Sequence, residues 1–209
     1  MAAGWTRKSF SSDGVTEHPV GPHFQRLRSR FGGAVVLALD VSGSMQGDRI
    51  SKAVKGCQRF IDEAVDAGYQ VGVILWHHGV EGDTPPEASP KAAHSLLSRA
   101  VAAGGNNAGP FLTLAHQQLM ALDVGDRVVA IFGDGDLGDR RTAESKAADL
   151  IKDNIRILTC GLGEGSAQEL ATISTEKAAP RTASSENLAL RSFPWVVAGR
   201  LNVQHAVLV

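Results

Sequence analysis

Residues 34–39 form an uninterrupted apolar run, Ala-Val-Val-Leu-Ala-Leu. A strand exposed on one face alternates apolar and polar side chains, whereas a central strand of a parallel sheet is covered on both faces. The run therefore predicts a buried parallel strand. Parallel neighbours need crossover connections, which are usually helices, so this segment favours α/β architectures for the chain.

The rest of the chain repeats this alternation of strand and helix patterns. Further strand-like segments rich in apolar residues lie at 69–76, 127–132 and 155–160. They are separated by amphipathic stretches with apolar residues at 3.6-residue spacing. The pattern predicts a doubly wound α/β fold. Its central sheet is mostly parallel, and helices cover both faces.

Local signals predict where several helices begin and end. Asp48 is expected to cap a helix that Gly68 terminates. Pro110 is expected to open a later helix, and Asp139 to cap the helix after that. By contrast, the segment 79–90 holds three prolines and is predicted to be irregular over most of its length.

The chain ends differ from the middle in composition. Residues 1–32 hold five basic residues against two acidic ones and are rich in Gly, Ser, Pro and Thr. They predict an irregular basic arm, which is either a solvated tail or a contact arm for an acidic partner. The expected organisation is this arm, one domain over 33–201, and a short tail over 202–209.

Polar side chains follow two of the apolar runs directly. Asp40, Ser42 and Ser44 come after the first run, and Asp134 comes after a later one. Asn106 lies just before a predicted helix, after a pair of glycines that permits close backbone approach. Ligands bind at the carboxyl ends of parallel strands, so neighbouring strands would bring all three loops to one crevice. Oxygen donors of low total charge favour a hard cation such as Mg²⁺ over Zn²⁺.

These motifs, in this order, resemble the von Willebrand factor type A domain family. They are Asp-x-Ser-x-Ser at 40–44, a Gly-Gly turn at 104–107 similar to the family's Gly-Gly-Thr turn, and an apolar strand ending in Asp-Gly at 134–135. Gly133 stands where the family has Thr. The resemblance covers about residues 33–201 and implies the family's fold and its metal-ion-dependent adhesion site.

The resemblance also implies a role for each candidate ligand. Ser42 and Ser44 would bind the cation directly, while Asp40 and Asp134 would act mainly through water or by orienting ligands. Asn106 stands in place of the family's Thr, and its neighbour Asn107 is the alternative if the turn shifts by one residue. The implied cofactor is Mg²⁺, with Mn²⁺ or Ca²⁺ as alternatives.

The implied function is non-enzymatic recognition of an acidic side chain on another protein, through the cation. Free-standing intracellular members are similar to adaptors that work beside ATPase chaperones, stress-response or defence proteins, so this class of partner is expected. Two alternatives remain open: an interaction domain with a degenerate, metal-free site, and a hydrolase that uses the cation to activate water. The sequence lacks a Gly-x-Ser-x-Gly nucleophile elbow and a Walker motif, which disfavours an enzyme.

Charge and cysteine content support an intracellular interaction protein. The net charge of -1 gives no general attraction to nucleic acid or membranes. No segment approaches the ~20 apolar residues of a membrane span, and no secretory leader is evident. Cys57 and Cys160 lie in apolar-patterned segments and are expected to be reduced core thiols. A cytoplasmic location is therefore expected.

Overall fold

The computed structural model describes residues 32–162 and 166–175. In this part of the chain, five strands form one sheet in the order β3-β2-β1-β4-β5. Four of them are parallel, and β3 runs antiparallel to β2. The strands are β1 (Gly33–Asp40), β2 (Gln70–Trp76), β3 (Val80–Glu87), β4 (Asp126–Gly133) and β5 (Ile155–Gly161). The predicted α/β fold with a mostly parallel central sheet is confirmed.

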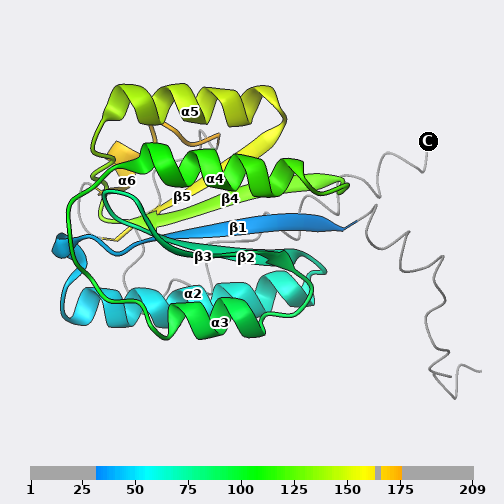
Figure 1. Ribbon diagram of the computed structural model, residues 1–209, viewed down its shortest axis with the longest axis horizontal. Coiled ribbons are helices and arrows are strands. Elements are labelled where there is room, and N and C mark those ends of the chain that lie inside the picture. The colour runs from blue at the N-terminus through cyan, green and yellow to red at the C-terminus, as the bar shows by residue number, and fades with distance from the viewer. Residues whose placement is uncertain (1–31, 163–165, 176–209) are drawn as a thin grey trace, which may run out of the picture.

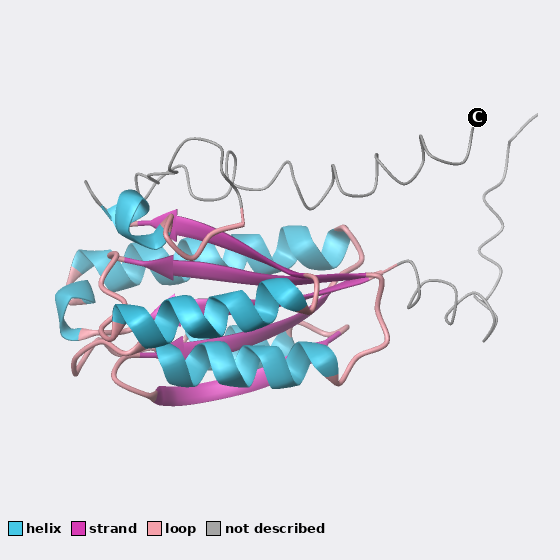
Figure 2. Cartoon of the chain, turned by 90° about the horizontal axis from the view of Figure 1, so that it is seen from above, coloured by secondary structure: helices cyan, strands magenta, loops and turns pink. Residues whose placement is uncertain are grey.

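Helices cover both faces of this sheet (Figure 1). One face carries α2 (Asp48–Asp66) and α3 (Lys91–Leu97), and the other carries α4 (Ala108–Met120) and α5 (Arg140–Lys152). The 3₁₀ turn η1 (Gly43–Met45) and the short helix α6 (Ser166–Leu170) follow β1 and β5. Figure 2 shows the helices and strands running along the same long direction, as βαβ crossovers require.

The two faces of the sheet each pack a separate apolar core. Alternate residues of β1 point to opposite faces: Leu37 and Leu39 belong to the core under α2 and α3, and Ala38 to the core under α4 and α5. Phe60 and Phe132 meet in the first core, with ring centroids 5.8 Å apart. In the second core, the rings of Trp76 and Phe111 pack in a tilted arrangement, with centroids 4.6 Å apart. This double burial explains why β1 is apolar at every position before Asp40.

The prediction of irregular structure over 79–90 was wrong, because β3 occupies most of it. β3 is an edge strand with a single neighbour, so Pro85 and Pro86 can be accommodated without interrupting a ladder on both sides. The pairing with β2 is irregular at this point, and the Thr84 hydroxyl accepts the hydrogen bond of Val73 N at 3.1 Å. A side chain thus replaces a backbone acceptor in the ladder.

Predictions of helix termini had mixed outcomes. Asp48 does not cap α2: the cap position is Gly47, whose φ of 77° turns the chain out of η1, and Asp48 is the first helical residue. Gly68 does end α2, with φ of 85°. Pro110 lies third in α4 rather than first. The cap predicted at Asp139 is confirmed, since its carboxylate accepts from Thr142 N at 3.2 Å.

Parts of the predicted organisation lie outside the described residues. These parts are the basic arm up to residue 31, the domain beyond 175 and the tail over 202–209. Among the described residues, no helix has the length and apolar character needed to cross a membrane.

Gly72 is expected to be indispensable for the β2–β3 pairing. A methyl group there would lie 2.7 Å from the Thr84 carbonyl oxygen and 2.8 Å from Pro86 N, so the edge strand would have to move. Gly72→Ala should lower the free energy of unfolding by about 1–3 kcal/mol, measured by urea denaturation. Gly79→Ala is the matched control, with no atom within 4 Å and an expected change within about 0.5 kcal/mol. Equal effects of the two variants would contradict this account.

Candidate metal centre

The carboxyl ends of β1 and β4 bring Asp40 and Asp134 to the same edge of the sheet. The two strands are parallel neighbours, with Leu39 aligned to Phe132, so the next residues leave the sheet side by side. A methyl group at Gly133, the residue before Asp134, would lie 3.0 Å from Asp40 Oδ2, so the two segments are in close contact. The neighbouring strands assumed from the sequence are therefore present.

Asp40 is a completely buried carboxylate. Its Oδ1 accepts a hydrogen bond from Ser42 N at 2.8 Å. Its Oδ2 is enclosed and has no hydrogen-bond partner among the described residues. Burial raises the pKa of Asp40 from 3.8 to about 6, and the charge of Asp134 adds to this, against the opposing effect of the Ser42 amide and hydroxyl and the Asp134 backbone amide. The fold therefore holds a carboxyl whose charged form is only partly compensated by the described protein groups.

The loop after β1 places two hydroxyls beside this carboxylate. Ser42 is fully buried, and its Oγ lies 3.0 Å from the Oγ of the exposed Ser44. The intervening η1 turn is fixed by the hydrogen bond from Met45 N to the Ser42 carbonyl, and the Met45 side chain is buried in the core below. The serines thus come from a short, anchored turn, which favours a defined arrangement of their oxygens.

A second loop, before α4, is attached to the first by backbone hydrogen bonds. Gly43 N donates to Gly104 O at 3.0 Å, and Ala103 N donates to Val41 O at 2.8 Å. Gly104 has φ of 77°, and a side chain there would meet His78 Nδ1 at 3.0 Å. The close approach predicted for the glycine pair is confirmed at Gly104, for both conformational and steric reasons.

The two asparagines of this loop have different environments. Asn107 is the N-cap of α4, and its Oδ1 accepts from Gly109 N at 3.1 Å. Asn106 instead donates through Nδ2 to the carbonyl of Asp136, 2.9 Å away, and its Oδ1 receives no hydrogen bond from a described residue. Of the two possible replacements for the family's Thr, Asn106 has the more available oxygen.

The third loop, after β4, completes the rim. Asp134 is partly exposed, and its Oδ1 lies 3.5 Å from Asp136 N, at the limit of a hydrogen bond. Asp136 in turn accepts from Gly138 N at 2.9 Å, while its carbonyl holds Asn106. The three loops thus form one connected network around Asp40.

The donors of this crevice fit a hard cation. They comprise two hydroxyls, two carboxylates and one amide oxygen, the oxygen ligands that Mg²⁺ and Ca²⁺ prefer. The unpartnered Asp40 Oδ2 supplies the negative charge that such an ion would neutralise. Within residues 32–162 and 166–175, no cluster of three or more His, Cys, Asp or Glu side chains has metal-binding geometry. A cation at this position would therefore need the hydroxyl and amide oxygens as ligands as well.

Comparison with known proteins agrees with this fold. Residues 34–193 match the von Willebrand factor type A (vWA) domain. The chain belongs to this family. No match was found among curated proteins.

Solved structures show the same vWA fold. The vWF domain of the type V pili tip protein Mfa5 from Porphyromonas gingivalis superposes with a TM-score of 0.70 at 13% identity, covering 84% of this chain and 96% of that one. The protein BatB from Bacteroides thetaiotaomicron gives 0.57 at 23% identity, covering 63% and 67%. Proximal thread matrix protein 1 from the mussel byssus, in a structure with a zinc-occupied MIDAS motif, gives 0.63 at 19% identity, covering 77% and 46%. The chain spans less than half of that mussel protein.

Gly133, which departs from the vWA motif, has a steric role. A methyl group at this position would lie 3.0 Å from both Cβ and Oδ2 of Asp40. The lack of a side chain therefore leaves room for the buried carboxylate. In the sequence, Gly133 differs from the family only by standing in place of a Thr, because the spatial neighbour that explains the residue lies on a different strand.

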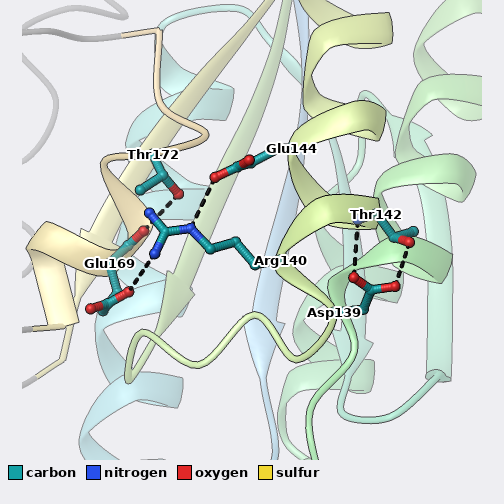
Figure 3. Close-up of polar contacts among 6 residues, drawn as sticks. All are labelled: Asp139, Arg140, Thr142, Glu144, Glu169 and Thr172. Atoms are coloured by element: carbon teal, nitrogen blue, oxygen red, sulfur yellow. Dashed lines mark hydrogen bonds and ion pairs between the residues drawn. The ribbon is translucent and has the colours of Figure 1, made fainter.

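A cavity of about 540 Å³ lies beside the loop that carries Asp134. Asp134 and Leu137 line it on one side, and Ser166 and Glu169 on the other. Arg140 at its edge forms ion pairs with Glu144 of α5 and Glu169 of α6, as Figure 3 shows. The same figure shows Asp139 at the start of α5, where its carboxylate accepts a hydrogen bond from the Thr142 hydroxyl. Asp139 is therefore a helix cap and not a candidate ligand.

The burial of Asp40 predicts a specific pH dependence of stability. Because its pKa is about 6 in the folded protein and 3.8 is the ordinary value, the folded state binds the extra proton between these values. Stability of the metal-free protein should therefore fall as pH rises from 4 to 7. Asp40→Asn lacks this charge and should become more stable relative to the wild type over that range, by about 3 kcal/mol at pH 7.

Urea denaturation in a chelating buffer at pH 4, 5.5 and 7 measures this difference. The comparison between the two proteins cancels contributions from histidine–carboxylate pairs such as His116 with Asp153, which are present in both. Stability curves that stay parallel from pH 4 to 7 would show that Asp40 carries no such penalty.

Proposed function

We propose that this vWA domain binds another protein through a divalent cation held by Asp40, Ser42, Ser44, Asn106 and Asp134. Mg²⁺ is the proposed ion, with Mn²⁺ or Ca²⁺ as alternatives. The observation that carries the proposal is the fully buried Asp40 carboxyl with its unpartnered Oδ2. A buried charge of this kind is costly unless it is paired or coordinates a metal.

The protein groups divide into direct and indirect ligands. Ser42 and Ser44 present neutral hydroxyls, already adjacent at 3.0 Å, and are the proposed direct ligands. Asp40 and Asp134 are proposed to act through water, and Asn106 to add its amide oxygen. With few direct carboxylates, the bound cation supplies an electrophilic position for one carboxylate oxygen of another protein.

The proposed partner is therefore a protein with an accessible Asp or Glu side chain. A partly exposed Asp134 and an exposed Ser44 leave the rim reachable from outside. The mussel structure with a zinc-occupied MIDAS motif is a precedent for an occupied site on this fold. We propose no binding of nucleic acid or membrane, in keeping with the net charge of -1.

We further propose a non-enzymatic, cytoplasmic adaptor that works with an ATPase chaperone or a stress or defence protein. This partner class rests on the family resemblance alone. Support for a reducing compartment comes from the low cysteine content: the sequence has two cysteines, Cys57 and Cys160, and both lie buried in the apolar core. Support for a non-enzymatic role comes from the serine hydroxyls, which contact each other rather than a histidine base.

Cation binding is expected to stabilise the folded protein. At a free Mg²⁺ concentration of 100 times the dissociation constant, the free energy of unfolding should rise by about 2.7 kcal/mol. Ser42→Ala combined with Ser44→Ala should abolish the increase, because it removes the direct ligands. Urea denaturation with Mg²⁺ and with a chelator measures both effects.

A second double variant controls for the loss of serines in general. Ser51→Ala with Ser95→Ala removes two exposed hydroxyls from α2 and α3 and should keep the full Mg²⁺ effect. If no shift occurs at millimolar Mg²⁺, Mn²⁺ or Ca²⁺, the metal-dependent proposal is wrong and the domain is a metal-free interaction module.

A further inference from the structure

Arg49 is an exposed residue that the fold holds against the loop carrying Ser42 and Ser44. It lies in the first turn of α2, directly after the Gly47 turn. Its Nη1 donates to the carbonyl oxygen of Ser44 at 3.2 Å, which directs the guanidinium back over this loop. No sequence pattern points to this contact, since it depends on how the turn before α2 folds back.

The guanidinium of Arg49 has N–H donors that make no hydrogen bond to the described residues, and its charge is not neutralised by an ion pair with them. A guanidinium carries five N–H donors, and the described structure uses one of them, on a neutral carbonyl. Within residues 32–162 and 166–175, Arg49 forms no ion pair. Its positive charge is thus available to a ligand that approaches the metal loop.

The loop after β4 offers a ligand less available positive charge. It contributes the partly exposed Asp134 and the exposed Asp136. Arg140, in the helix that follows, is paired with Glu144 at 2.9 Å and Glu169 at 3.6 Å (Figure 3).

The starts of α2 and α5 also carry other exposed charges, Asp48 beside Arg49 and Arg141 beside Arg140. Arg49 is distinguished by its hydrogen bond to the Ser44 carbonyl, which holds its guanidinium at the loop of the proposed direct ligands.

We propose that Arg49 binds a second carboxylate of the partner, in the same segment whose first carboxylate reaches the metal loop. This inference rests on the proposed function and makes it more specific. The partner motif has two acidic side chains close in sequence. An arginine suits this role because its planar fork makes two parallel hydrogen bonds to a carboxylate, and it stays charged at all relevant pH values.

Three end-capped synthetic peptides of glycine and serine test the proposal with the full chain. One carries a single aspartate, one carries two aspartates in adjacent positions, and one carries two separated by one residue. Affinities are measured by amide NMR titration in Mg²⁺ at physiological salt. The wild-type protein is expected to bind at least one two-acid peptide about 5–10-fold more tightly than the single-acid peptide.

Arg49→Ala should remove this preference while leaving single-acid binding nearly unchanged. Arg59→Ala is the matched control, an exposed arginine farther along the same helix, and should keep the preference. A preference that survives in Arg49→Ala, or that is absent from the wild type while the single-acid peptide still binds, overturns the inference.

Repeating the titrations with a chelator in place of Mg²⁺ distinguishes failure of the Arg49 inference from failure of the proposed function. If Mg²⁺ and chelator give the same binding of all three peptides, or if no peptide binds in Mg²⁺, the metal-bridged recognition is wrong and the inference falls with it. If single-acid binding requires Mg²⁺ but Arg49→Ala behaves as wild type, only the role of Arg49 is wrong.

Discussion

The organisation of the crevice depends on one carboxylate, Asp40, placed at the end of the most buried strand of the sheet. Asp40 has no surface exposed to bulk solvent, and its partner Ser42 N satisfies only one of its oxygens. Every neighbouring feature relates to this charge: Gly133 leaves it space, Asp134 raises its pKa, and two serine hydroxyls lie beside it. A buried carboxylate with an unsatisfied oxygen is costly unless it is paired or coordinates a metal, and this cost is the reason for the proposed cation.

The stability of the sheet and its two cores offsets the cost of burying the Asp40 carboxylate. Four parallel strands with helices on both faces give two separate cores, so β1 is held rigidly from each side. Loops that leave such a sheet can carry unfavourable groups, because the scaffold and not the loop supplies the stability. The backbone bonds between the loops at 41–43 and 103–104 then keep the donors in place.

Local and spatial information contributed differently to the predictions. Apolar runs identified β1, β2, β4 and β5, and the Asp139 cap was visible in sequence, because each depends on near neighbours. β3 was missed because its prolines are compatible with a strand only at a sheet edge, and edge position is a property of topology. The cap predicted at Asp48 was wrong because α2 begins one residue earlier than expected. Gly47, with φ of 77°, occupies the cap position, and this backbone angle cannot be read from the sequence.

The sequence alone determined the fold class and the chemical kinds of donor, since apolar periodicity and the Asp-x-Ser-x-Ser pattern are written in consecutive residues. Tertiary structure decided which groups meet. It separated Asn106 from the capping Asn107, showed that Gly133 lies under the Asp40 carboxylate, and turned Arg49 back over the metal loop. These relations join residues from different elements or depend on one backbone angle, and neither the distance nor the angle follows from a linear pattern.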